Sequence, residues 1–88
     1  MPTADEIRQQ IRAFILENYL KGAPSSALAD DTSLERSHIV DSARVLDLIL
    51  FVEETFAFEV QNEEALPENF DSVDNLVGYV QRKLATPG

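Results

Sequence analysis

Apolar residues recur at helical spacing in three stretches of the chain, and residues that begin or end helices bound each stretch. Near the amino end, Thr3 and Glu6 match a capping box, in which each side chain accepts the backbone N–H of the other. Behind them lies one apolar stripe: Ile7, Ile11, Phe14 and Ile15. Gly22 suits the end of a helix and Pro24 cannot continue one, so the pattern predicts a helix over about residues 4 to 20.

The longest apolar pattern runs from Ala43 to Phe56 and predicts the most buried helix. Its main stripe consists of Val45, Leu48, Ile49, Val52 and Phe56. Three more apolar side chains widen the stripe beyond one face: Leu46, Leu50 and Phe51. We therefore expect the other helices to surround this one largely, with Asp47, Glu53 and Glu54 marking its solvent side.

The rest of the chain predicts one more long helix, one short helix and a long loop. Asp71 and Ser72 precede a helical stripe made by Val73, Leu76, Val77, Val80 and Leu84. Asn62 is expected to cap a one-turn helix through residues 63–65 that Pro67 closes, after Phe58 and Val60 plug the end of the core. Residues 22–40 form the loop, with Leu34 directed inward. The expected fold is all-α, in one domain over residues 1–88, with its core at about 4–84 and a flexible tail at 85–88.

The net charge of the chain narrows the kinds of partner that it can bind. The 88 residues carry a formal charge of -9 and no cysteine, which leaves no disulfide, thiolate metal site or thiol nucleophile. Between Val45 and Gln81 there is no Lys or Arg, while nine acids occur: Asp47, Glu53, Glu54, Glu59, Glu63, Glu64, Glu68, Asp71 and Asp74. Such a surface repels nucleic acid and anionic membranes and favours basic protein partners, although solubility alone also explains it.

We expect neither a membrane-spanning segment nor a signal peptide. No apolar run approaches the about 20 residues that span a bilayer, and the first residues lack the basic and apolar regions of a signal peptide. We expect a soluble cytoplasmic protein, complete from Met1, that acts as a monomer.

The chain lacks the residues that the common catalytic sites of enzymes require. His38 is the only histidine, and it lies in a loop four residues before Ser42 with nothing to hold it as a base. We expect no metal site, because one histidine and no cysteine make a poor ligand set and no calcium-loop motif occurs. Ser42, after Asp41 and before the most apolar helix, is either a helix cap or the attachment point of a prosthetic group. A helix start favours a phosphodiester through its free N–H groups.

At these residues the chain resembles the acyl carrier protein family, including the peptidyl and aminoacyl carriers. The family pattern is a long first loop, a D-S-L motif opening an acidic second helix, a short third helix and an amphipathic fourth. Asp41-Ser42-Ala43 stands at that motif, Glu53-Glu54 and Phe56 continue the match, and Phe70-Asp71-Ser72-Val73 leads into the last helix. The resemblance covers nearly the whole chain and implies a four-helix bundle of acyl-carrier type that is not an enzyme.

The resemblance also implies a chemistry for this site. Ser42 would carry 4'-phosphopantetheine, added from coenzyme A by a phosphopantetheinyl transferase, and Asp41 would assist recognition or magnesium placement during loading. Ala43, Asp47, Glu53 and Glu54 would dock basic partners, among them an acyl- or aminoacyl-adenylating ligase and downstream acyl-transfer enzymes. The cargo would be an acyl or aminoacyl group held as a thioester.

Two departures from the family pattern qualify this interpretation. Ala43 replaces the usual Leu, and His38 stands where related carriers commonly have Gly. Ile39 and Val40 make the chain more similar to free-standing carriers in specialised lipid or secondary-metabolite pathways than to the fatty-acid carrier. Two alternatives stay open: an unmodified acidic helical module that binds a basic partner, and a carrier fold that has lost loading.

Overall fold

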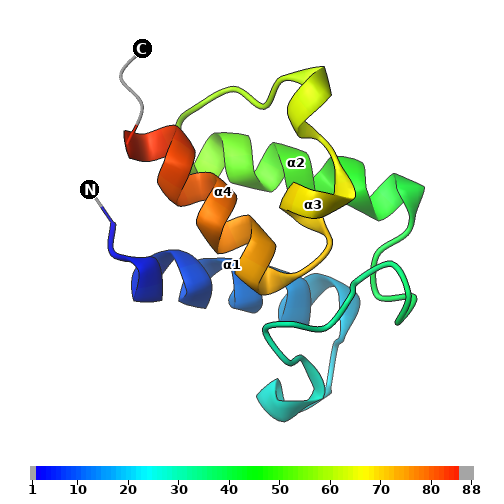
Figure 1. Ribbon diagram of the computed structural model, residues 1–88. Helices are drawn as coiled ribbons and strands as arrows, with labels where there is room; N and C mark the ends of the chain where they lie inside the picture. Colours follow the sequence, from blue (N-terminus) through cyan, green and yellow to red (C-terminus); the bar gives the residue numbers. More distant parts are fainter. Residues whose placement is uncertain (1, 86–88) are drawn as a thin grey trace.

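The computed structural model describes residues 2–85, which form four α-helices (Figure 1). These are α1 (Ala4–Tyr19), α2 (Ser42–Phe56), α3 (Pro67–Phe70) and α4 (Val73–Ala85). Short 3₁₀ turns lie at Ser25–Ala27 and Asn62–Glu64, and no strand occurs within the described range. The predicted all-α fold, with three main helices, a short third helix and a long first loop, is confirmed.

Helix α1 begins with the capping box that the sequence predicts. The Glu6 N–H donates to Thr3 Oγ1 over 3.1 Å, and the Thr3 N–H donates to Glu6 Oε1 over 2.9 Å. The second bond favours the ionised carboxylate and lowers the pKa of Glu6. The α1 stripe then buries its isoleucines to 1% exposure or less: Ile7, Ile11 and Ile15.

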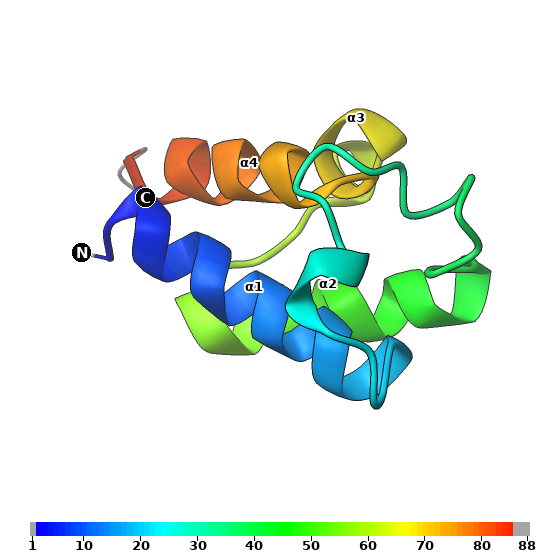
Figure 2. The same ribbon diagram turned by 90° about the horizontal axis from the view of Figure 1, so that it is seen from below.

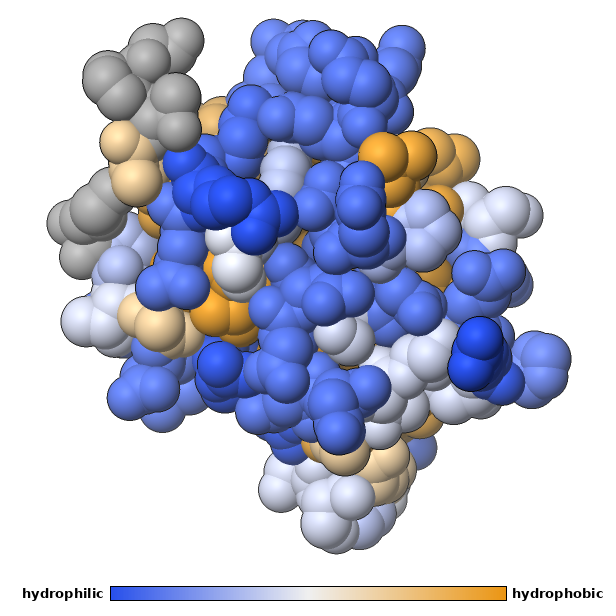
Figure 3. All heavy atoms as spheres, in the orientation of Figure 1, coloured by the Kyte–Doolittle hydropathy of each residue, from blue (hydrophilic) through white to orange (hydrophobic). Residues whose placement is uncertain are grey.

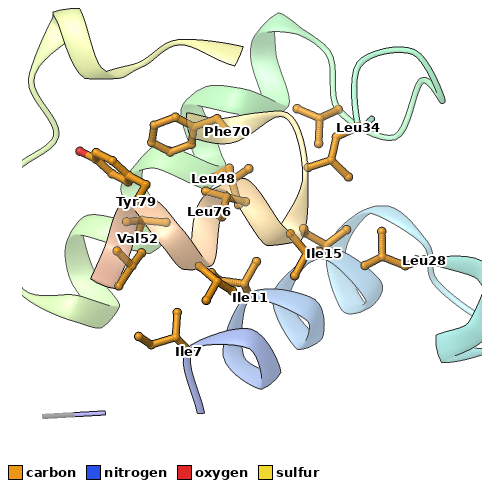
Figure 4. Close-up of a cluster of buried hydrophobic side chains, with 14 of the residues drawn as sticks. Ile7, Ile11, Ile15, Leu28, Leu34, Leu48, Val52, Phe70, Leu76 and Tyr79 are labelled. Atoms are coloured by element: carbon orange, nitrogen blue, oxygen red, sulfur yellow. The ribbon is translucent and has the colours of Figure 1, made fainter. Parts of the chain in front are cut away.

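One hydrophobic core joins the helices and the long loop. Helices α1, α2 and α4 contribute fully buried side chains, while Phe70 of α3 and Leu28 and Leu34 of the loop close its edges (Figure 4). The first turn of α1 and the last turn of α4 lie at the same end of the molecule, and α3 lies at the other end of α4 (Figures 1 and 2). This arrangement places the start of α2 beside α3 and the end of the long loop.

Ion pairs fasten the long loop to α1, and a further pair joins α1 to α4. Asp30 accepts from Arg12 Nη1 over 2.7 Å and from Arg8 Nη1 over 3.0 Å, and Arg8 Nη1 also reaches Asp74 over 2.6 Å. Leu28 and Leu34 are each 1% exposed, so apolar burial and ion pairing hold the same segment. The loop is therefore a fixed part of the fold, and the inward position of Leu34 is confirmed.

The expectation that other helices largely surround α2 is wrong. Leu46 is 61% exposed and Leu50 is 54% exposed, whereas Leu48 and Val52 are fully buried. The other elements cover only one side of α2, and side chains four residues apart lie on one face of a helix. Leu46 and Leu50 therefore share the solvent side with Asp47.

The connection between α2 and α4 also differs from the prediction. Gln61, and not Asn62, precedes the 3₁₀ turn, and its N–H donates to Glu64 Oε1 over 3.0 Å. Pro67 begins α3 instead of closing a helix, because proline suits a first turn where no N–H partner is needed. The predicted cap of the last helix is confirmed, since the Asn75 N–H donates to Ser72 Oγ over 3.0 Å. Helix α4 extends through Ala85, and the rest of the predicted tail, 86–88, lies outside the described residues.

Candidate functional site

Asp41, and not Ser42, caps helix α2. Its Oδ1 accepts the N–H of Arg44 over 2.9 Å and the N–H of Ala43 over 3.0 Å. These two bonds satisfy donors that a helix start leaves open. The Arg44 N–H, with the Ala43 N–H, stabilises the ionised carboxylate and lowers the pKa of Asp41 below its ordinary value of 3.8.

Ser42 is the first residue of α2, and its side chain is exposed. Because the Asp41 carboxylate performs the capping, the Ser42 hydroxyl makes no hydrogen bond to any residue from 2 to 85. The position combines a fixed backbone with a hydroxyl that is open to reagents from solvent.

The end of the long loop, directly before α2, is fixed by hydrogen bonds and by burial of its side chains. The Ile39 and Val40 N–H groups both donate to Leu34 O over 3.0 Å, and both side chains are 7% exposed. Asp71 anchors the same loop: the Leu34 N–H donates to Asp71 O over 2.7 Å. Asp71 thus fastens the loop, a role that its predicted place in a helix cap did not suggest.

His38 has a backbone φ of +61°, a left-handed conformation that glycine adopts more readily than L-residues do. A glycine here, as in the family pattern that the sequence resembles, would adopt this φ without a steric cost. Its side chain is exposed, and no hydrogen bond joins it to Ser42 in the part of the chain that the structure describes. The geometry gives no support to a serine–histidine pair.

Arg44 connects the first turn of α2 to the loop and to α1. Its Nη1 donates to Ile39 O over 2.9 Å, and its guanidinium lies 5.2 Å from the centre of the Tyr19 ring. The Tyr19 hydroxyl in turn donates to Arg44 O over 3.0 Å, and burial raises the pKa of Tyr19. In the sequence, Arg44 showed no functional sign beyond a single basic side chain at the start of an acidic helix.

An open groove lies beside Ser42, between the long loop, α2 and α3. Its apolar lining includes Val40, Val45, Leu66 and Phe70, and its polar edge includes Asp41 and Ser42. Leu66 is 41% exposed, so part of the groove presents apolar surface to solvent. Figure 3 shows the face of the molecule seen in Figure 1, where small hydrophobic areas lie among mainly hydrophilic side chains.

The predicted docking residues divide into two groups. Ala43, Asp47 and Glu54 are exposed on α2. Glu53 is only half-exposed, and its Oε2 accepts the Val60 N–H over 2.9 Å, so this carboxylate holds the chain after α2.

The exposed leucines of α2 complete the outer face of this helix. Leu46 and Leu50 lie at helical spacing with Ala43, Asp47 and Glu54, at positions 43, 46, 47, 50 and 54. Helical spacing alone did not separate these leucines from the core stripe, because apolar residues of α2 occupy more than one face. The exposed face is therefore apolar as well as acidic.

Residues 2–85 contain no group of three or more His, Cys, Asp or Glu side chains that could hold a metal ion. Over the same range, no helix is long and apolar enough to cross a membrane.

A four-helix domain with a long first loop and an exposed serine opening the second helix is the class of protein that the sequence resemblance implied. No family model matches the chain. The chain is similar to the probable acyl carrier protein PigG of Serratia sp. (strain ATCC 39006), with 34% identity over 73 residues that make up 83% of each protein. The chain belongs to the acyl carrier protein family. Members of this family are carriers and not enzymes, and the chain accordingly has a carrier role.

Proposed function

We propose that the chain carries acyl or aminoacyl intermediates on a 4'-phosphopantetheine arm attached to Ser42. It delivers them to partner enzymes in a specialised lipid or secondary-metabolite pathway of the cytoplasm. The observation that carries this proposal is the exposed Ser42 hydroxyl, which is free of hydrogen bonds within residues 2–85 while Asp41 caps the helix.

The residues around Ser42 fit such a group. A phosphodiester on the serine would lie at the positive end of α2, and the neighbouring groove offers apolar surface and a polar edge to an extended arm. When bound, the arm supplies the thiol that this cysteine-free chain lacks and that holds cargo as a thioester. Asp41 is exposed next to Ser42, where a transferase can use its carboxylate for recognition or magnesium placement during loading.

The outer face of α2 is the proposed docking surface for basic partners. Asp47 and Glu54 supply charge, and Ala43, Leu46 and Leu50 supply apolar contact between them. Exposed charges steer association and are screened by salt, which suits short-lived contacts with a transferase, an adenylating ligase and acyl-transfer enzymes.

Intact-mass measurement tests the proposal. After incubation with coenzyme A, magnesium and a broad-specificity phosphopantetheinyl transferase, the wild-type chain is expected to gain one phosphopantetheine group. Ser42→Ala is expected to gain none. Ser37→Ala is the matched control, because Ser37 is also exposed and its hydroxyl donates to Ser33 O over 2.7 Å.

Other outcomes of this experiment contradict the proposal. A wild-type mass that several transferases leave unchanged would favour an unmodified acidic interaction module. If Ala43→Leu then gained the group, the chain would be a carrier fold that has lost loading.

A further inference from the structure

Aromatic rings fill the space where α3 and the segment that follows α2 meet α4. Phe70 is 3% exposed and Tyr79 is 2% exposed, and their ring centres lie 5.3 Å apart. The half-buried Phe58, which follows α2, lies with its ring centre 5.8 Å from that of Tyr79. Figure 4 shows Phe70 and Tyr79 next to the buried Leu48 and Leu76. Side chains therefore pack this part of the interior, where α3 lies against α4.

Polar contacts hold these rings in place. The Tyr79 hydroxyl donates to Glu64 Oε1 over 3.1 Å, and Lys83 Nζ donates to the same oxygen over 3.1 Å. Lys83 Nζ also lies 5.7 Å from the centre of the Phe58 ring. Together with the Gln61 N–H, these donors lower the pKa of Glu64, because all of them favour its ionised form. An apolar chain entering here would have to displace rings that a partly buried hydrogen bond and an ion pair restrain.

The space next to Ser42, in contrast, is open to solvent. The groove between the loop, α2 and α3 is open at the surface. Apolar side chains of α2 and of the α3 segment line part of it, and charged and polar side chains line its edge, among them Glu35, Arg36, His38 and Asp41. It can accept a short group and leave polar atoms in contact with water. It does not offer the closed apolar surroundings that a long hydrocarbon chain needs to leave water.

We propose that the cargo is a short acyl or aminoacyl group, held in the surface groove and not within the helical core, and that Phe58, Phe70 and Tyr79 exclude longer apolar chains. The inference rests on the proposed function, because it presupposes an arm on Ser42. It names the class of substrate for that site: thioester-bound groups of a few heavy atoms, including polar ones.

Thioester protection tests this inference on the intact chain. The transferase would load wild-type protein from acetyl-, octanoyl- and dodecanoyl-coenzyme A, and each loaded form would be treated with hydroxylamine while its mass is followed. We expect similar cleavage rates for all three chains, with no rise in the thermal midpoint as the chain lengthens. If the octanoyl or dodecanoyl thioester is cleaved about tenfold more slowly than the acetyl thioester, the inference is overturned. Such a rate means that the acyl group is buried about nine-tenths of the time.

A pair of phenylalanine variants tests the role of the rings. Phe58→Ala should open space against Tyr79 and slow the cleavage of the octanoyl form relative to wild type. Phe14→Ala is the matched control, because Phe14 is also half-buried but stacks on Phe51 between α1 and α2, with ring centres 4.2 Å apart. Circular dichroism would establish that both variants fold. Equal octanoyl cleavage in Phe58→Ala and wild type would contradict exclusion by the rings.

The mass spectra separate this inference from the proposed function. A wild-type chain that takes up no group contradicts both. A chain that loads normally but protects a long acyl group contradicts only the short-cargo inference.

Discussion

Asp41 and Ser42 are neighbours with different tasks. The Asp41 carboxylate accepts two N–H groups of α2, and this leaves the Ser42 hydroxyl exposed. The sequence could not assign these tasks, because aspartate and serine are both good capping residues. The backbone conformation determines which residue is the cap. Asp41 has an extended conformation, with φ of -110°, as a cap position requires, whereas Ser42 is already helical.

The lowered pKa of Asp41 makes a prediction about stability and pH. A carboxyl group whose pKa is lowered in the folded chain contributes stability above its ordinary pKa of 3.8, and it loses this contribution as the pH falls through the folded value. Thermal unfolding of wild type should therefore move to lower temperature as the pH is reduced below about 4. Asp41→Asn keeps a capping oxygen without the titrating group, so its midpoint should change less over the same range.

Glu6 and Glu64 also have lowered pKa values and contribute to the wild-type slope. They are present in both proteins, so the comparison isolates Asp41. Identical pH profiles for wild type and Asp41→Asn would contradict the assigned cap.

At the scale of elements, α2 has two apolar faces with different tasks. Leu48 is fully buried, whereas Leu46 is 61% exposed. Leu48→Ala should lower the free energy of unfolding by about 2 to 5 kcal/mol, the usual cost of removing a core leucine side chain. Leu46→Ala should change it by less than about 0.5 kcal/mol, as is usual for surface substitutions. Urea unfolding of the two variants measures both values, and equal losses would show that the assigned faces of α2 are wrong.

Glu53 and Glu54 are adjacent acids with different roles in the structure. Glu53 accepts the Val60 N–H, while Glu54 is exposed. Glu53→Gln should keep most of the stability, because its side-chain oxygen can still accept that N–H. Glu53→Ala should lower the free energy of unfolding by about 1 kcal/mol, the typical net value of a hydrogen bond.

Glu54→Lys is the corresponding test of docking. It should leave unfolding nearly unchanged and weaken turnover by a basic partner enzyme. Stability lost in Glu54→Lys but kept in Glu53→Ala would reverse the two roles.

Helical spacing and caps were sufficient to predict α1, α2 and α4, because each has a clear apolar stripe and a residue that caps its start. The outward leucines were missed because apolar residues at 45–52 occupy more than one face of α2 and only the packing of the other helices selects the buried one. The bond from Val60 to Glu53 depends on a turn at Ala57, whose φ is +59°. Alanine gives no sign of such a conformation, whereas glycine would have done so.

Over the whole molecule, basic and acidic side chains have different uses. Basic side chains are used within the fold: Arg8 and Arg12 hold the loop, Arg44 holds the start of α2, and Lys83 holds Glu64. Asp47 and Glu54 on the outer side of α2 are left for partners, in a chain whose formal net charge is -9. The prediction of a monomeric, single-domain protein stays a prediction.

The proposed function requires that Ser42, and no other serine, receives the arm. Peptide-level mass spectrometry of the loaded chain locates the modified residue. Trypsin cleaves after Arg36 and Arg44, which places Ser37 and Ser42 in one peptide, residues 37–44, so fragment ions must separate the two serines. We predict that the added phosphopantetheine lies on Ser42 alone. Its detection on Ser37 or in any other peptide, or a peptide 37–44 that stays unmodified, would contradict the claim.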